Sequence, residues 1–147
     1  MYTESLPLYL TGLVVKGFGR GSKALGIPTA NLEEKVVEAL PSNFNTGVYY
    51  GWASLDGKIY KMVASIGWNP FYKNEKKTVE VHMLHKFEND LYGQQIKVIF
   101  VGYIRPEQDF SSIEELITAI NNDISVAEKQ LEQPPLNIYK NDKFLKE

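Results

Sequence analysis

The amino-acid sequence predicts a mainly β domain whose sheet closes into a small barrel, with one long helix packed beside or across it. Three observations lead to this fold class. Strand-like runs occupy most of the chain, the two clearest are joined by Asp56-Gly57, and a single late segment has helical periodicity. Tight hairpins favour antiparallel pairing. A short chain protects its sheet edges best by closing the sheet on itself.

Length and composition are those of one ordinary globular domain. The 147 residues are 44% hydrophobic and 23% charged, and the formal net charge of −2 gives no general footprint for nucleic acid. With no cysteine in the chain, disulfides and thiolate chemistry are excluded. There is no apolar run long enough to span a membrane and no secretory signal. We therefore expect a cytoplasmic monomer with no membrane or nucleic-acid partner.

The first predicted strand covers residues 9–16, where apolar residues dominate and Gly17 ends the run. Residues 32–45 have a mixed pattern. Within them, residues 33–40 fit either a short helix or an irregular connection, which Pro41 closes. No strand is predicted between residues 17 and 45.

The clearest structural signal is a β-hairpin over residues 46–66. Two β-rich runs flank Asp56-Gly57, the dipeptide typical of a type I′ turn, because both central residues need positive φ. A two-residue turn also sets the register, and large residues then face small ones. The predicted pairs are Ala53 with Tyr60, Gly51 with Met62, and Tyr49 with Ala64. Glycines at 47 and 51 indicate sharp sheet curvature or a close ligand.

Residues 67–77 form a predicted loop with three aromatic side chains, Trp68, Phe71 and Tyr72, which either cap one end of the core or cover a planar ligand. Residues 78–85 then alternate strictly. This periodicity turns Val79, Val81 and Met83 toward the core and leaves the residues between them on the opposite face. Glu80 and His82 would then be surface residues.

The last strand is predicted over residues 94–104, and a helix over residues 109–133 with a capping box at Ser112 and Glu115. One helical stripe is apolar, which indicates core packing. Its members are Ile113, Leu116, Ile117, Ile120, Ile124, Ala127 and Leu131. Pro134-Pro135 ends the helix, and apolar residues in the tail indicate that part of the tail docks on the domain.

Residues 17–31, GFGRGSKALGIPTAN, have the composition of a phosphate-binding loop. Glycines let a ligand approach peptide N–H groups closely, and Lys23 supplies a point charge for phosphate. Thr29 and Asn31 supply oxygen atoms suited to Mg²⁺ or a phosphate. The spacing matches neither the Walker loop nor the dinucleotide fingerprint. From the residues alone, a phosphate site and an ordinary surface loop both remain open.

Taken in order, the motifs resemble the riboflavin kinase family in its single-domain eukaryotic form. They are GFGRGSKALGIPTAN, TGVYYGWA, SIGWNPFYKN, Glu80-x-His82 followed by His85, LYG, and VGYIRPE. The resemblance runs from about residue 9 to residue 131. It implies a closed six-stranded antiparallel Greek-key barrel (about 8–105) with a helix (about 112–132) packed against it and a tail (134–147). Bacterial relatives usually add an adenylyltransferase domain, for which this chain has no room, so FMN formation without FAD synthesis is implied.

The resemblance also implies an activity and a set of site residues. ATP would donate its γ-phosphoryl group to the ribityl 5′-hydroxyl of riboflavin, assisted by Mg²⁺ or Zn²⁺, with Glu80 as the catalytic base. Thr29 and Asn31 would hold the metal and the phosphates. Further ATP contacts are implied at Gly17, Lys23, Met83, His85 and Tyr92, and flavin contacts at Arg105, Gln108 and Phe110. The family varies in residue type at the positions of Met83 and Gln108, which is consistent with backbone contacts.

The periodicity and the resemblance conflict at Glu80, because a base must line the site whereas alternation places this side chain outside. An active site on the outer wall of the barrel, covered by loops and the helix, would reconcile them. Two other functions are kept open: a non-catalytic flavin or nucleotide binder on the same barrel, and a single-strand-binding barrel with aromatic stacking, against which the negative net charge weighs.

Overall fold

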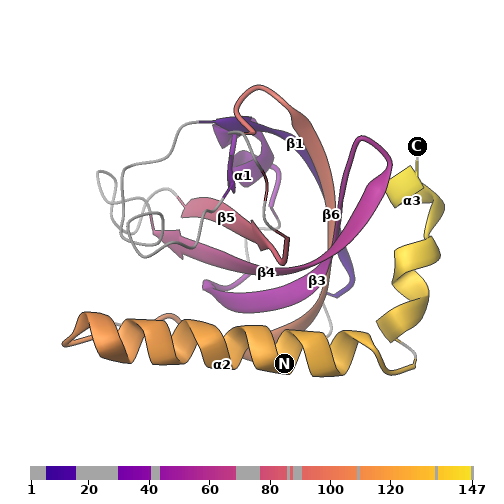
Figure 1. The fold of residues 1–147 in the computed structure, drawn as a ribbon. Coiled ribbons are helices and arrows are strands. Elements are labelled where there is room, and N and C mark those ends of the chain that lie inside the picture. Colours follow the sequence, from indigo (N-terminus) through magenta and orange to yellow (C-terminus); the bar gives the residue numbers. More distant parts are fainter. Residues whose placement is uncertain are drawn as a thin grey trace.

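The computed structural model describes residues 6–15, 30–40, 44–68, 77–85, 87, 91–108, 110–134 and 136–146. Six strands close into a barrel in the order β1-β2-β5-β4-β3-β6, and every neighbouring pair is antiparallel. The predicted fold class is therefore confirmed (Figure 1). The elements are β1 (Leu8–Val15), β2 (Ala30–Leu32), α1 (Glu34–Glu38), β3 (Gly47–Leu55), β4 (Lys58–Trp68), β5 (Lys77–Met83), β6 (Gln95–Arg105), α2 (Ile113–Leu131), η3 (Leu136–Asn141) and α3 (Lys143–Lys146).

The hairpin between β3 and β4 is as predicted. Asp56 and Gly57 have φ of 51° and 80°, the left-handed conformation that a type I′ turn requires. The register also matches in all three predicted pairs, Ala53 with Tyr60, Gly51 with Met62, and Tyr49 with Ala64. The strand that residue patterns missed is β2, whose three residues are too few to show alternation.

The barrel interior is filled by side chains. Tyr49 lies at its centre, with ring centroids 5.2 Å from Phe44 and 5.5 Å from Phe100, and its hydroxyl donates to the Asn45 carbonyl over 2.7 Å. Gly51 allows β3 and β6 to approach closely, since a Cβ there would sit 1.8 Å from the Ile99 carbonyl oxygen. The register between these strands shifts at this point. The close approach of β6 therefore accounts for a glycine at position 51.

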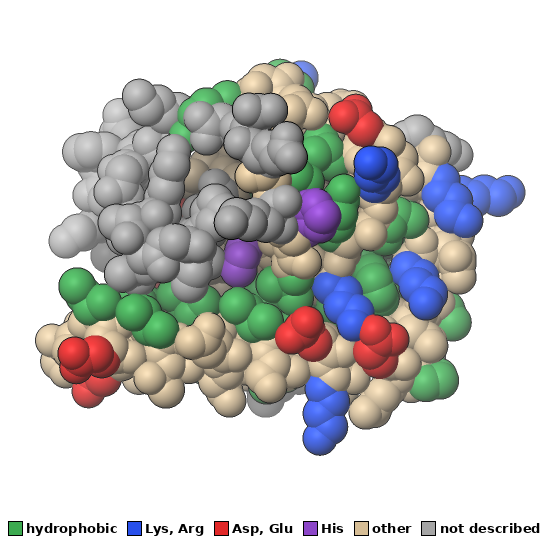
Figure 2. All heavy atoms as spheres, in the orientation of Figure 1, with side chains coloured by type: hydrophobic (Ala, Val, Ile, Leu, Met, Phe, Trp, Pro, Cys, Tyr) green, Lys and Arg blue, Asp and Glu red, His purple; other side chains and the backbone are tan. Residues whose placement is uncertain are grey.

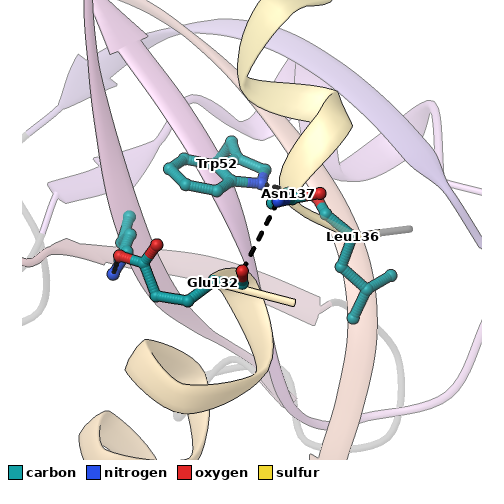
Figure 3. A network of polar contacts seen from close by, with 5 residues as sticks. Trp52, Glu132, Leu136 and Asn137 are labelled. Carbon is teal, nitrogen blue, oxygen red and sulfur yellow. Dashed lines mark hydrogen bonds and ion pairs between the residues drawn. The ribbon is translucent and has the colours of Figure 1, made fainter. Parts of the chain in front are cut away.

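A second apolar core lies on the outer wall, where α2 and the tail cover β3, β4 and β6 (Figure 1). Trp52 belongs to this outer core, and its Nε1 donates to the Leu136 carbonyl over 3.0 Å. Figure 3 shows this junction, in which Asn137 also donates to the Glu132 carbonyl over 3.4 Å. Leu145 is buried in the same core. The prediction that part of the tail docks is confirmed.

The apolar stripe of α2 is buried over only part of its length. Ala127 and Leu131 are fully buried, whereas Ile113 is 63% exposed. Figure 2 shows hydrophobic side chains gathered along the edge of α2 on the side of the barrel. The expectation of core packing therefore holds for the C-terminal half of the helix, where α2 lies on the outer core. Within the described part of the chain, no helix is both long and apolar enough to cross a membrane.

Candidate functional site on the outer wall

The centre of the candidate site is Glu80, near the middle of β5. It lies directly opposite Asn31 of β2 on one side and Ser65 of β4 on the other. Directly opposed residues in antiparallel strands project from the same face, with Cβ atoms about 5 Å apart. Three polar side chains from three strands therefore share one patch of the barrel wall.

The patch lies outside the barrel. Val79 and Val81 are 0% and 1% exposed in the interior core, so the alternation of β5 turns Glu80 and His82 outward. The alternation predicted from sequence is thereby confirmed. The interior of the barrel is filled by side chains, so the outer face of β5 is where Glu80 would meet a substrate if it acts as predicted.

Asn31 contains a buried acceptor with no partner. Among the buried side-chain oxygen and nitrogen atoms of the described residues, Asn31 Oδ1 is the one without a hydrogen-bond partner. An unpaired buried carbonyl is costly, and an amide oxygen is a hard ligand of the kind that Mg²⁺ prefers. The described residues contain no cluster of three or more His, Cys, Asp or Glu side chains that could hold a metal. The chemistry of Asn31 fits a metal or phosphate that binds through amide and hydroxyl oxygens.

His82 lies at the boundary between the polar patch and the outer core. It is opposite Val63, which belongs to the outer core. Burial lowers the pKa of His82 below its ordinary value of 6.5, because desolvation disfavours the charged imidazolium. The imidazole next to Glu80 is therefore neutral near pH 7.

Arg105 and Phe110, two of the predicted flavin contacts, lie together at the end of β6. The guanidinium carbon of Arg105 is 5.6 Å from the ring centroid of Phe110. Arg105 also forms a bidentate ion pair with Asp123 of α2, with Nε–Oδ1 and Nη2–Oδ2 distances of 2.9 and 2.8 Å. Gln108 is exposed on the connection between β6 and α2.

Glu107 joins the Arg105 region to the Glu80 patch. A Cβ built on Gly67 would sit 2.2 Å from Glu107 Oε1, so the Glu107 carboxylate rests against the outer side of Gly67. Gly67 in turn lies opposite Thr78 of β5, two residues from Glu80. The connection that follows β6 therefore reaches the same stretch of wall as the predicted base.

The predicted nucleotide contacts that are described lie at two places. Tyr92 is exposed in a turn whose Gly93 N–H donates to the Val14 carbonyl over 2.8 Å, beside the end of β1. The His85 ring contacts Tyr60 in a tilted arrangement and Phe87 edge-on, with centroid distances of 4.8 Å in both cases. The Met83 side chain is buried in the barrel core, so any contact it makes with a nucleotide is through its backbone.

Several predicted residues lie outside the described residues: Gly17, Lys23 and Thr29, with Phe71 and Tyr72 of the aromatic loop. The third aromatic of that loop, Trp68, is half-buried, with Lys77 Nζ 5.4 Å from its ring centroid. Trp68 is part of β4 rather than of a loop.

Residue patterns missed two members of this region, Ser65 and Asp123. A signal existed for Asp123, since an acidic residue at this position falls on the apolar stripe of α2, between Ile120 and Ala127. No comparable signal existed for Ser65, because its position depends on how β4 pairs with β5.

The fold and the outer-wall patch together define a class of protein: a small closed antiparallel β-barrel that carries a cluster of polar side chains on its outer wall. The family model described as "Flavokinase: Riboflavin kinase" matches residues 5–131. Riboflavin kinase from Mus musculus is 56% identical over 142 residues, covering 96% of this chain and 92% of the relative. The Homo sapiens riboflavin kinase is 56% identical over 140 residues, covering 95% and 90%.

A solved structure agrees with these relatives. The crystal structure of riboflavin kinase from Trypanosoma brucei matches with a TM-score of 0.75 and 31% identity, covering 96% of this chain and 90% of that chain. The chain belongs to the riboflavin kinase family, and its activity is the ATP-dependent phosphorylation of riboflavin to FMN. The alternative of a non-catalytic binder is not favoured, because the curated relatives are kinases.

Proposed function

We propose that Glu80 is the base that accepts the proton of the ribityl 5′-hydroxyl while the oxygen attacks the γ-phosphorus of ATP. The bond between the ribityl 5′-oxygen and the γ-phosphorus forms as the bond from the γ-phosphorus to the bridging β-phosphate oxygen breaks, and ADP leaves. A primary alcohol is a weak nucleophile, so a carboxylate within hydrogen-bond reach assists it. The observation that carries the proposal is the register of β2, β5 and β4, which sets Glu80 directly beside Asn31 and Ser65.

Asn31 would bind the phosphate end of ATP together with Thr29. The unpaired, buried Oδ1 of Asn31 supports this role, because a bound cation would satisfy it. When bound there, Mg²⁺ or Zn²⁺ would neutralise charge on the phosphate oxygens, which phosphoryl transfer requires. Amide and hydroxyl ligands favour Mg²⁺ over Zn²⁺, which takes nitrogen and sulfur ligands more readily.

The remaining nucleotide contacts are proposed at Gly17, Lys23, His85, Tyr92 and the backbone of Met83. Support comes from the turn of Tyr92, which is bonded to the end of β1 just before residues 17–29 begin. The exposed imidazole of His85, in contact with the rings of Tyr60 and Phe87, could contribute a ring surface to a base.

The flavin is proposed to lie between the Arg105–Phe110 pair and the Glu80 patch. Phe110 offers an apolar ring, and Arg105 offers donors for the carbonyl oxygens of the flavin. Contact of Glu107 with the outer side of Gly67 supports the idea that these two regions adjoin. Gln108 is proposed to contact the flavin through its backbone.

The test of the base is Glu80→Gln, which keeps the shape but not the proton acceptor. We expect kcat for FMN formation to fall about 10²–10⁴-fold, the usual contribution of a general base, with riboflavin and ATP binding retained. Glu128→Gln, at an exposed carboxylate of α2, is the matched control and should keep parental activity. A Glu80→Gln enzyme with parental kcat would remove Glu80 from the role of base.

The cytoplasmic location and the monomeric state stay predictions. Cell fractionation and light scattering of the purified protein test them directly. A comparison of FMN formation with Mg²⁺, Zn²⁺ and no added metal tests which cation the enzyme uses.

A further inference from the structure

Asp123 is a buried acid on a helix face that otherwise packs apolar side chains. Asp123 is 2% exposed. Ser54 and Asp123 are the buried polar residues of the described part of the chain, and of these two Asp123 is the ionisable one. One turn further along α2, Ala127 and then Leu131 fill the outer core. A charge taken out of water is destabilising unless it is paired with good geometry, so its presence here calls for a partner and a reason.

The partner is Arg105, and the geometry is a parallel fork. Nε donates to Oδ1 over 2.9 Å and Nη2 donates to Oδ2 over 2.8 Å. The guanidinium plane is further limited by Phe110, whose ring centroid is 5.6 Å from Cζ, and by a longer bond of 3.4 Å from Nη1 to the Pro106 carbonyl. The contacts with Asp123, Phe110 and the Pro106 carbonyl together fix the orientation of the Arg105 guanidinium.

This orientation divides the donors of the guanidinium into two edges. The Nε–Nη2 edge faces Asp123. An arginine has five N–H groups in a rigid plane. Two of them bond Asp123 and one, on Nη1, bonds the Pro106 carbonyl, so the second hydrogen of Nη1 and the outer hydrogen of Nη2 are left, and the Nη2 hydrogen points away from Asp123. These two remaining hydrogens are the donors that Arg105 can offer to acceptors on a substrate.

The Arg105–Asp123 ion pair could instead serve only to stabilise the packing of α2 against β6. Buried ion pairs are poor devices for that purpose, since apolar residues of similar volume hold elements together equally well or better. The neighbouring turn of α2 does so with Ala127 and Leu131. An ion pair is therefore better explained by what it does to the orientation of Arg105.

We propose that Asp123 is a positioning residue for riboflavin: it holds the Arg105 guanidinium so that its outer edge meets the acceptor atoms of the flavin. The inference rests on the proposed contact between Arg105 and the flavin. It assigns to α2 a part in substrate selection, in addition to its packing on the barrel.

The first test is Asp123→Asn, which keeps the volume and removes the charge. We expect the riboflavin KM to rise about tenfold or more, the order expected for disturbing a charge-assisted hydrogen bond, while the ATP KM stays at the parental value. Ala127→Gly is the matched control, since it destabilises the same helix and keeps both the Asp123 carboxylate and the Arg105 guanidinium. It should lower Tm and leave the riboflavin KM unchanged. A folded Asp123→Asn enzyme with parental riboflavin KM overturns the proposal.

A double-mutant cycle separates this proposal from the flavin contact on which it rests. Arg105→Ala alone should raise the riboflavin KM, and adding Asp123→Asn to it should raise it no further, because Asp123 acts through Arg105. If Arg105→Ala leaves the riboflavin KM unchanged, the flavin contact fails. The positioning role fails if Arg105→Ala raises the riboflavin KM and Asp123→Asn then raises the KM of the Arg105→Ala enzyme by the same factor as it does in the parent.

Arg105→Lys answers the same question if Asp123→Asn does not fold. Lysine keeps the charge and can still pair with Asp123, but it lacks the planar fork. A rise of the riboflavin KM similar to that of Arg105→Ala supports orientation as the cause. A parental riboflavin KM in a folded Arg105→Lys enzyme overturns it.

Discussion

The interior of the barrel and its outer wall use the same strands for different purposes. On β5, Val79 and Val81 close the interior, while Glu80 and His82 on the opposite face line the candidate site. The interior is packed so tightly that Gly51 is needed where two strands meet. The wall, in contrast, holds an unpaired buried acceptor at Asn31. The comparison teaches that one face of these strands is committed to packing, whereas the opposite face can carry polar side chains.

The largest expected effect is on the interior side, at Gly51. In Gly51→Ala the new Cβ would meet the Ile99 carbonyl oxygen at 1.8 Å. Backbone cannot yield as a side chain does, so we expect a loss of about 4 kcal/mol or more in the free energy of unfolding. Urea denaturation followed by tryptophan fluorescence measures it.

Gly57→Ala is the control for this substitution. Gly57 has φ of 80°, but a Cβ added there would have no atom within 4 Å, so only backbone strain of about 1 kcal/mol is expected. Equal losses in Gly51→Ala and Gly57→Ala would show that crowding in the interior is not what requires Gly51.

The next largest effect concerns the covered part of the wall. Leu131 is fully buried in the outer core, whereas Ile113 at the other end of α2 is 63% exposed. We expect Leu131→Ala to cost about 3 kcal/mol of unfolding free energy and Ile113→Ala to change it by less than about 0.5 kcal/mol. Chemical denaturation of both variants measures the difference. Similar losses would mean that α2 is held along its whole length.

A smaller effect of opposite sign is expected at Asn31, in the polar patch on the wall. Asn31→Val removes the unpaired Oδ1 and introduces a residue with high strand propensity. We expect the free energy of unfolding without ligands to rise by about 1 kcal/mol, while metal-dependent FMN formation falls. Differential scanning calorimetry and an FMN assay measure the two quantities.

Thr11→Val is the control for strand propensity, since Thr11 is exposed on β1. It should change stability by less than about 0.5 kcal/mol and keep activity. A destabilised Asn31→Val protein would indicate that Oδ1 is satisfied in the free enzyme.

The smallest effect is a pH dependence due to His82. Burial lowers the pKa of His82 in the folded state below 6.5, so as the pH falls below 6.5 the unfolded chain takes up a proton first and stability decreases. Above that pH both states are neutral and the residue contributes no slope. His82→Gln should flatten the profile of Tm against pH on the acid side. An unchanged slope in His82→Gln would contradict the prediction.

Local features made much of the fold predictable. The type I′ turn at Asp56-Gly57 specified the register of β3 and β4. The predicted N-cap of α2 is present, with Ser112 Oγ accepting from the Glu115 N–H over 3.2 Å, although the Glu115 carboxylate accepts from Ser111 rather than from the Ser112 N–H. The candidate site was harder to predict from the sequence. Motif order pointed to Glu80, Asn31 and Arg105, yet nothing in the residues adjacent to them indicated Ser65 as a neighbour.

What the sequence by itself determined is therefore local: strand alternation, the hairpin turn, the helix with its cap, and a motif order that resembles one family. These follow from interactions between residues a few positions apart, which a linear pattern records. Only the tertiary structure decided that Asn31 faces Glu80, and that Asp123 holds Arg105. Both pairings depend on closure of the barrel and on where α2 docks. Those in turn depend on the packing of side chains far apart in the chain, which no short stretch of sequence encodes.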